Sequence, residues 1–503
     1  MLKVMRKSGI LLPIASLPSP YGIGCFSREA YTFVDRLKEA GQSYWQILPL
    51  GPTSYGDSPY QSFSTFAGNP YFIDPEDLIE RGWITEKICR SYDFGDDLKY
   101  IDYGKIYESR FRLLRHAYEN SKIAQDADFQ HFTRQNAYWL EDYSLYMAVK
   151  ESFGNVSWVE WDEDIKLRKQ EALSAYREKF ADQVVFYQFQ QYLFFKQWER
   201  LKKYANGKGI RIIGDIPIYV ALDSSDAWAN PELFQFDENC SPTAVAGCPP
   251  DAFSATGQLW GNPLYRWDYH RQTGYEWWMK RMESCYERYD VVRIDHFRAF
   301  DAYYSISYGE LTAENGVWKQ GPGYEFFEIM KEKLGEKEVI AEDLGFLTSS
   351  VIELVKRSGY PGMKVLQFAF DSREESDYLP HNYIHNCVVY TGTHDNDTVV
   401  GWYDTLAGKD KELCNAYLNL PEEISPECLA WEFIRAAMAS VASMAIIPMQ
   451  DYLGLGTEAR INTPSTIGNN WKWRLGEGDF TEELAEKIKA ITKLYGRLPK
   501  EKG

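Results

Sequence analysis

The stretch that decides the fold is Val291-Val292-Arg293-Ile294-Asp295-His296, a short apolar run that ends beside a carboxylate. A run of this kind, rich in β-branched residues and almost continuously apolar, is typical of a strand buried on both faces. Six similar runs are Tyr44–Leu50, Arg211–Val220, Glu338–Asp343, Met363–Phe370, Asn386–Thr393 and Ala445–Gln450. Helical patterns separate most of these runs, which indicates parallel βαβ units. We therefore predict an α/β fold, a (β/α)8 TIM barrel.

Two segments are longer than a minimal barrel requires. Residues 51–205 are mostly helical, and residues 221–288 are loop-rich, with proline and glycine around Cys248-Pro249-Pro250. Segments of this length are usually functional loops or subdomains. We expect one catalytic body over residues 1–503, with the first segment as a helical insertion, the second inserted over the active-site cleft, and no separate C-terminal β-domain.

Signals at helix ends place four helices, at about residues 27–40, 74–82, 425–442 and 481–495. Ser27 stands where a side chain caps a helix N-terminus, and Gly41 follows the end of that helix. The pairs Asp74-Pro75 and Ser425-Pro426 put proline at the first helical position, where its missing N–H costs nothing.

The chain is acidic, since 55 Lys and Arg residues against 73 Asp and Glu residues give a formal net charge of −18. This charge repels phosphate backbones and anionic lipids, so nucleic acid and membranes are poor candidate partners and a neutral substrate fits better. We expect neither a secretory signal nor a membrane-spanning segment. The eight cysteines form no C-x-x-C pair, which favours reduced thiols and a cytoplasmic location. A bond or metal role for the closest pair, Cys240 and Cys248, stays open.

Acidic residues mark the ends of several predicted strands. They occur in Ile212–Asp215, Val291–His296, Val339–Asp343, Tyr390–Asp395 and Gln450-Asp451. One such carboxylate is often structural, as a helix cap or an ion-pair partner. Several together are expected to converge at the C-terminal face of a barrel, where barrel enzymes place their chemistry.

Cleavage of a glycosidic bond requires this kind of carboxylate cluster. One carboxylate attacks the anomeric carbon and one carboxylic acid protonates the leaving oxygen, and in retaining enzymes the two lie about 5–5.5 Å apart. Burial and a nearby carboxylate raise the pKa of the acid. A neighbouring arginine keeps the nucleophile ionised.

These motifs resemble the α-amylase clan and, within it, the amylomaltases of glycoside hydrolase family 77, also called disproportionating enzymes. The resemblance covers nearly the whole chain, and Trp45–Leu50 resembles the family's first strand. Ile218-Tyr219-Val220 lacks the histidine that ordinary α-amylases carry there, as amylomaltases do. The matching motifs are Ser8–Pro13, Pro20–Gly24, Trp45–Leu50, Gly56–Ser62, Ala67–Pro70, Gly214–Val220, Pro249–Ser254, Gly257–Pro263, Arg293–Arg298, Ala341–Gly345 and Gly392–Asn396.

The resemblance implies a role for each matching residue. Asp295 is the expected nucleophile, Glu342 the general acid and then the base, and Asp395 a stabiliser of the transition state. The implied substrate-binding residues are Tyr60 as a platform under the sugar, Asp215 and Arg293 beside the nucleophile, Trp260 over the acceptor side, His394 as a hydroxyl partner, and Asn462 as a polar residue of the cleft. Asp371 is equally compatible with binding sugar and with merely ending its strand.

Structural roles compete with functional ones at several of these positions. Asp343 should point away from Glu342 across its strand and is interpreted as structural. Asp395 is also compatible with capping a helix near Asp397, and Trp260 with packing inside its loop. His296 is left without a role, because such a histidine is more often a buried hydrogen-bonding residue than a catalyst.

The implied reaction transfers α-1,4-glucan segments to the 4-hydroxyl of an acceptor by a retaining double displacement, including cyclisation. Glucans, maltooligosaccharides and glucose are the expected partners. Transfer requires a positioned sugar to outcompete water. The Gly247–Trp260 loop and the many aromatic residues of the inserted segments, in a chain that is 16% aromatic, are suited to exclude water from the site. A hydrolase of the same clan would share the carboxylates, whereas a non-catalytic glucan-binding protein would have lost one. We find no metal motif and expect no cofactor; the sequence does not predict the oligomeric state.

Overall fold

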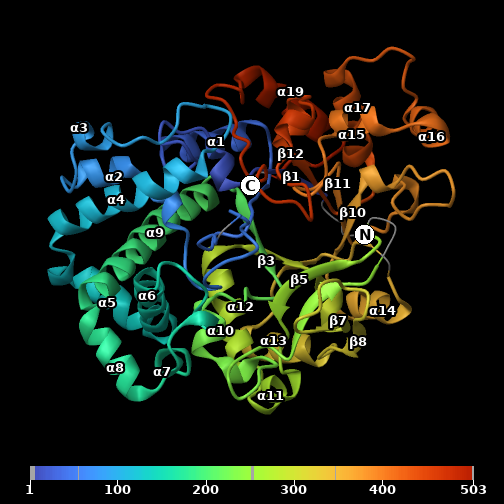
Figure 1. The fold of residues 1–503 in the computed structure, drawn as a ribbon. Helices are drawn as coiled ribbons and strands as arrows, with labels where there is room; N and C mark the ends of the chain where they lie inside the picture. Colours follow the sequence, from blue (N-terminus) through green and yellow to red (C-terminus); the bar gives the residue numbers. More distant parts are fainter. Residues whose placement is uncertain (1–5, 55, 251–253, 346, 501–503) are drawn as a thin grey trace.

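The computed structural model describes residues 6–54, 56–250, 254–345 and 347–500, and within them eight parallel strands form a closed barrel. The order around the barrel is β1-β12-β11-β10-β9-β6-β3-β2, and pairing of β1 with β2 closes it. Figure 1 shows these strands at the centre of the molecule. The strands are β1 (Lys7–Leu11), β2 (Tyr44–Gln46), β3 (Arg211–Pro217), β6 (Val291–Asp295), β9 (Val339–Ala341), β10 (Gly362–Val365), β11 (Cys387–Tyr390) and β12 (Met444–Pro448). The predicted (β/α)8 barrel is confirmed.

The first strand was not predicted as a strand. β1 is a five-residue run that begins with Lys7 and contains Gly9, so its sequence carries a weak apolar signal. A Cβ atom at Gly9 would lie 2.6 Å from the Tyr44 carbonyl oxygen, so glycine is what allows β1 to pack against β2. The assignment of Trp45 to the first strand is therefore wrong, because it lies in β2.

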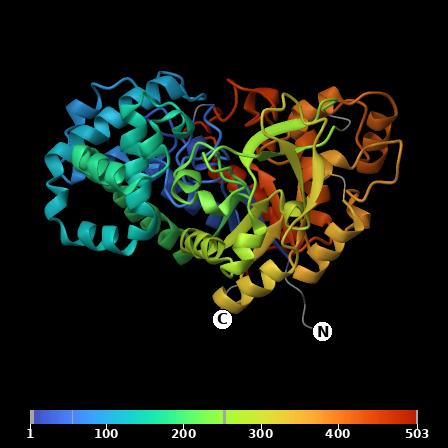
Figure 2. The same ribbon diagram turned by 60° about the horizontal axis from the view of Figure 1, so that its bottom comes forward.

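The long segment between β2 and β3 is helical, and Figures 1 and 2 show its helices gathered on one side of the barrel. The helices are α2 (Pro75–Glu80), α3 (Glu86–Cys89), α4 (Tyr103–Ser121), α5 (Ala127–Gln135), α6 (Ala137–Ser152), α7 (Glu163–Lys166), α8 (Gln170–Lys179) and α9 (Ala181–Gly207). Within this helical segment, α9 packs against the barrel helices α1 (Arg28–Glu39) and α12 (Glu276–Arg288). Trp198 donates to the Arg288 carbonyl oxygen at 3.0 Å, and the Tyr204 hydroxyl donates to Asp35 at 2.8 Å.

The segment predicted as loop-rich contributes two strands to a second sheet. In the described part of the chain this sheet has four antiparallel strands in the order β5-β4-β7-β8, and Figure 2 shows it beside the barrel. Its strands are β4 (Ala244–Cys248), β5 (Gln258–Pro263), β7 (Ala302–Ser307) and β8 (Val317–Gln320), and α10 (Ser225–Ala229), α11 (Trp267–Gln272) and α12 complete the segment. Two strands precede β6 in the sequence and two follow it, so no local pattern predicts their pairing. Residues 251–253 of the motif Pro249–Ser254 lie outside the described residues.

The remaining helices cover the other side of the barrel (Figure 1). They are α13 (Glu325–Leu334), α14 (Ser349–Ser358), α15 (Val399–Thr405), α16 (Gly408–Leu418), α17 (Pro426–Ala439), α18 (Met449–Tyr452) and α19 (Glu482–Leu494). The Asp74 and Ser425 side chains accept from backbone N–H groups at the starts of α2 and α17, as N-caps do. Ser27 precedes α1 as predicted, but its hydroxyl donates to Glu29 and does not cap the helix.

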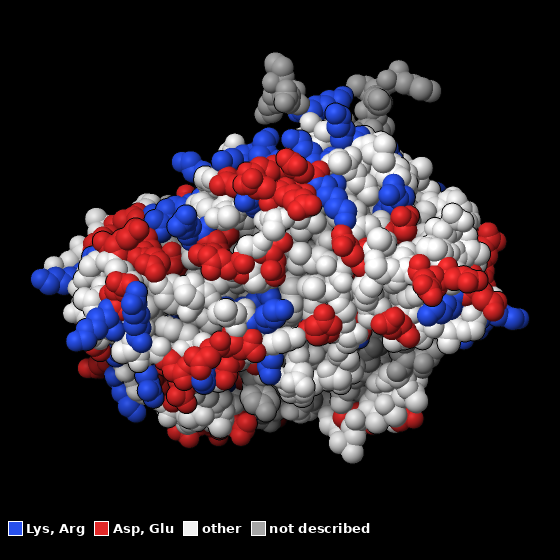
Figure 3. All heavy atoms as spheres, turned by 90° about the horizontal axis from the view of Figure 1, so that it is seen from above, with Lys and Arg blue, Asp and Glu red and all other residues white. Residues whose placement is uncertain are grey.

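The surface carries charges of both signs. Figure 3 shows clusters of acidic residues with basic residues between them over one face. Among the described residues, no helix combines the length and apolar character that crossing a membrane would need.

Candidate active site

Neighbouring barrel strands bring the predicted carboxylates to one end of the barrel. Asp215 lies in β3, Asp295 is the last residue of β6, and Glu342 directly follows β9. β6 pairs with both β3 and β9, and its register places Arg293 opposite Asp215 and Ile294 opposite Ala341. The carboxyl ends of parallel strands share one face of a barrel, which is why positions far apart in sequence meet here.

Arg293 links two of the carboxylates. Its Nη1 lies 2.6 Å from Asp215 Oδ2, and its Nη2 lies 3.0 Å from Asp295 Oδ1. Burial disfavours the charge on Arg293, but Asp215 and Asp295 more than offset this and raise its pKa. The Asp215 side chain is fully enclosed, whereas that of Asp295 keeps 30% of its surface exposed. Asp295 is thus fixed at one oxygen and still accessible to a ligand.

Two backbone amides hold Glu342. The His296 N–H donates to Oε2 at 2.7 Å, and the Leu344 N–H donates to Oε1 at 2.9 Å. His296 has φ of 54°, in the left-handed region that residues other than glycine seldom adopt. Such a conformation directly after the proposed nucleophile fits a functional constraint on the backbone. Burial and the nearby Arg298 lower the pKa of the His296 ring to about 3, so the ring is neutral near pH 7.

The two central carboxyl groups differ in their affinity for a proton. Burial and the charge of Asp295 together raise the pKa of Glu342 to about 7, against the opposing charge of Arg293. Burial raises the pKa of Asp295, Arg293 opposes this and the charges of Asp215 and Asp395 add to it, with the result that the pKa is about 6. Because Asp295 has a direct ion pair with Arg293, which favours its charged form, Glu342 is the carboxyl group of the two that keeps a proton more readily. General acid–nucleophile pairs have this order.

Asp395 is positioned from the loop after β11. Asn462 Nδ2 donates to its Oδ1 at 2.6 Å, and His394 Nε2 lies 3.3 Å from its Oδ2. Its side chain is 42% exposed. The alternative that Asp395 caps a helix is wrong, because Thr398 caps α15 by accepting from the Gly401 N–H.

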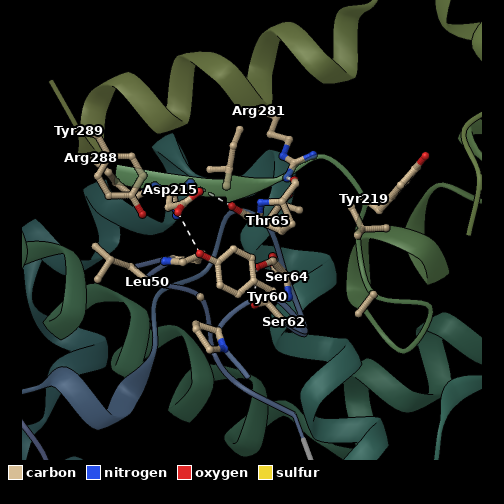
Figure 4. A pocket seen from close by; sticks show the side chains of 17 residues that line it. Leu50, Tyr60, Ser62, Ser64, Thr65, Asp215, Tyr219, Arg281, Arg288 and Tyr289 are labelled. Atoms are coloured by element: carbon tan, nitrogen blue, oxygen red, sulfur yellow. Dashed lines mark hydrogen bonds between the residues drawn. The ribbon is translucent and has the colours of Figure 1, made fainter. Parts of the chain in front are cut away.

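Tyr60 joins Asp215 to the Asp395 side of the site. Its hydroxyl donates to Asp215 Oδ2 at 2.9 Å, and its ring stacks on His394 with centroids 5.2 Å apart. Figure 4 shows this hydrogen bond at the wall of a small cavity of about 30 Å³. Trp471 was not predicted, yet its ring lies 6.0 Å from both Tyr60 and His394. Nothing in the sequence around Trp471 signals this contact.

Trp260 connects the second sheet to the nucleophile strand. Its ring meets the His296 ring edge-on, with centroids 4.8 Å apart and planes at 89°. Its indole Nε1 donates to Gln258 Oε1 at 3.1 Å, and the side chain remains partly exposed. Trp260 thus lies next to the residue that follows Asp295, while its role toward an acceptor stays a prediction.

Two further acidic residues have structural partners. Asp343 Oδ1 accepts from the Met363 N–H at 2.7 Å, which confirms its predicted structural role. Both oxygens of Asp371 accept from the Arg373 guanidinium, at 2.8 and 2.6 Å, and this pairing lowers the pKa of Asp371 to about 2. Asp371 is thus paired with Arg373, and sugar binding by Asp371 stays a prediction.

No group of three or more His, Cys, Asp or Glu side chains in the described parts of the chain is arranged to hold a metal ion. Cys240 precedes β4 and Cys248 is its last residue, and neither belongs to such a group among the described residues.

Carboxyl groups cluster around one arginine at the carboxyl ends of the barrel strands. This arrangement is that of a (β/α)8-barrel enzyme that acts on glycosidic bonds. The family model for 4-α-glucanotransferases matches residues 12–479. The chain belongs to the 4-α-glucanotransferase family.

Relatives match over nearly their whole length. The 4-α-glucanotransferase of Clostridium butyricum is 53% identical over 486 residues, which cover 96% of this chain and 99% of the relative. That of Thermus thermophilus is 47% identical, with 99% and 100% covered. A solved amylomaltase from Streptococcus agalactiae, in complex with acarbose, superposes with a TM-score of 0.94 at 43% identity and covers 98% of this chain and 100% of that one.

Proposed function

We propose that the protein transfers α-1,4-glucan segments by a retaining double displacement, with Asp295 as the nucleophile. The observation that carries this proposal is the position of Asp295, held by Arg293 at the end of β6, next to Glu342, which directly follows the adjacent strand β9. The names of near full-length relatives support the transferase reaction.

The first half-reaction cleaves the donor. Arg293 holds Asp295 Oδ1, which leaves Oδ2 to attack the anomeric carbon. As the bond from that carbon to the 4-oxygen of the leaving sugar breaks, Glu342 gives its proton to this oxygen. The product is a glycosyl ester on Asp295, and Glu342 is left as a carboxylate that the His296 and Leu344 amides stabilise.

The second half-reaction reverses these steps with a new sugar. The Glu342 carboxylate removes the proton from the 4-hydroxyl of the acceptor while that oxygen attacks the anomeric carbon. The ester bond breaks and Asp295 is released with its negative charge. Asp395, held by Asn462, is placed to stabilise the positive charge on the ring in both transition states.

We attribute the preference for a sugar over water as the acceptor to the residues that surround the ester on Asp295. Trp260, at its position against His296, is proposed to hold an acceptor ring and exclude water from the leaving-group side. Maltooligosaccharides, longer α-1,4-glucans and glucose are the proposed donors and acceptors. We also propose the helical segment 51–205 as an inserted subdomain of one catalytic body, and a cytoplasmic location in keeping with the scattered cysteines.

Incubation of the purified protein with maltotriose alone tests this function. Resolving the products by chain length should show glucose together with chains longer than three units, with little gain in reducing ends. Glucose and maltose with rising reducing ends and no longer products would make the protein a hydrolase of the same clan.

A further inference from the structure

A second cavity, of about 220 Å³, lies away from the catalytic carboxyl groups. It is enclosed by α6, α10, the region of α11 and α12, and the segment Ser64–Phe66. Its volume is several times the ~30 Å³ that one water molecule occupies in the liquid, so it has room for an organic ligand. Ser64 also lines the small cavity of Figure 4, so the segment around it separates the second cavity from Tyr60.

Aromatic rings form one wall of this cavity. Phe66 and Trp139 stack with centroids 6.3 Å apart, and Trp277 meets Phe66 at 90°. Tyr138 also meets Phe66 edge-on at 5.7 Å, while 51% of its surface is exposed. Trp277 remains partly exposed as well. The exposed parts of the Tyr138 and Trp277 rings are surfaces on which the apolar C–H face of a sugar ring can stack.

Hydrogen-bonding groups line the cavity beside these rings. Asp142, Asn230, Glu232 and Glu276 line the cavity. Asp142 pairs with Arg168 at 2.7 Å, and Glu276 pairs at 2.8 Å with Lys280, the basic residue among the lining residues. Carboxylates accept hydrogen bonds from hydroxyl groups and repel anions, which favours a neutral ligand with many hydroxyl groups.

The wall between the two cavities is already ordered. Asp226 accepts from the Thr65 N–H at 2.8 Å and from the Thr65 hydroxyl at 3.0 Å. Arg288 donates to the Thr65 carbonyl oxygen at 2.9 Å, and the Ser225 N–H donates to the Phe63 carbonyl oxygen at 2.8 Å. A ligand therefore meets a formed surface and loses little affinity to ordering it.

We propose that this cavity binds a glucose unit of a long α-glucan chain, as a holding site apart from the catalytic carboxyl groups. The class of ligand rests on the proposed function. A chain bound at both places must pass around the segment Ser64–Phe66, so we expect a long chain to occupy both places and maltotriose to occupy one at a time. The holding site should therefore raise the effective concentration of long glucans at Asp295 and leave maltotriose unaffected.

Two variants remove the site in opposite ways. Tyr138→Ala deletes an exposed stacking face, and Ala229→Trp fills the cavity from the end of α10. Tyr308→Ala is the matched control, because Tyr308 is also 51% exposed but does not line the cavity. Each variant is measured for KM on long amylose and kcat/KM on maltotriose, and, combined with Asp295→Asn, for retention on an amylose-containing native gel.

Both cavity variants should raise KM for amylose by about two- to tenfold, the effect expected for one lost stacking face. They should weaken gel retention and leave kcat/KM for maltotriose within the error of the assay, while Tyr308→Ala changes nothing. Unchanged amylose KM and retention in both cavity variants would overturn the proposal, as would an equal loss on maltotriose. The gel reads glucan binding without turnover, so it tests the cavity even if the unaltered protein fails to transfer glucose from maltotriose.

Discussion

The barrel end around Asp295 and the second sheet around Trp260 touch each other, but they are built differently. In the barrel, Asp215, Arg293 and Asp295 come from paired strands, and Glu342 accepts two backbone hydrogen bonds. The second sheet meets this network through the edge contact of Trp260 with His296. Its outer strand β8 is exposed at every residue.

The difference separates two tasks. Bond cleavage requires carboxyl groups held in fixed positions with different proton affinities, and adjacent barrel strands provide both. The selection of a sugar over water requires a surface beside the ester, which an element outside the barrel can provide without altering the chemistry. Substitutions in the barrel should therefore lower the rate of every reaction, whereas substitutions in the second sheet should change the products.

The largest effect is expected from Asp295→Asn. Loss of a covalent nucleophile should reduce the transfer rate by at least about 10⁴-fold, while thermal unfolding followed by circular dichroism shows an intact fold. Time courses with maltotriose measure the rate. More than a hundredth of the normal rate in this variant would contradict the assignment of the nucleophile.

Glu342→Gln should be nearly as severe with natural donors, with a loss of about 10³-fold for a missing general acid. The unaltered enzyme should lose activity above about pH 7, as Glu342 loses its proton, and below about pH 6, as Asp295 gains one. An α-maltosyl fluoride donor needs no protonation, so the fluoride burst of the variant should recover and keep only the decline at low pH. A surviving decline at high pH would assign the acid to another residue.

Arg293→Lys tests the link between the two aspartates. A lysine ammonium cannot reproduce the two directed contacts of the guanidinium at 2.6 and 3.0 Å, so we expect kcat/KM to fall by about 10²-fold. The low-pH decline should also move upward, because Asp295 loses part of the charge that opposes its protonation. A profile identical to that of the unaltered enzyme would mean that Arg293 has only a structural role.

The smallest effect on rate, and the clearest on products, is expected from Trp260→Ala. The ratio of transfer to hydrolysis should fall by about tenfold, equivalent to ~1.4 kcal/mol of acceptor binding, while donor consumption changes less. Leu259→Ala is the control, because Leu259 is the adjacent residue in β5 and is 39% exposed. If both variants keep the normal ratio, the second sheet does not select the acceptor.

The sequence was sufficient to predict the barrel and the convergence of its acidic residues, because apolar strands that end in carboxylates have one common meeting point. Tyr60, His394 and Asn462 were predicted only from the family resemblance. The sequence did not predict β1, whose glycine and polar residues weaken the strand pattern. The second sheet was not predicted because β4 pairs with β7, a strand that lies beyond β6 in the sequence. The two hydrogen bonds to the Glu342 carboxylate were also not predicted, because their donors are the backbone amides of His296 and Leu344 and no side chain indicates them.

The central claim is that a sugar is covalently bound to Asp295 during the reaction. Glu342→Gln should accumulate this ester from α-maltosyl fluoride, because the variant lacks the base that activates the acceptor. Mass spectrometry of the intact protein and its peptides should find one added maltosyl group on the peptide that contains Asp295. A maltosyl group on a different residue, or rapid fluoride release with no labelled protein at the earliest times, would contradict the account.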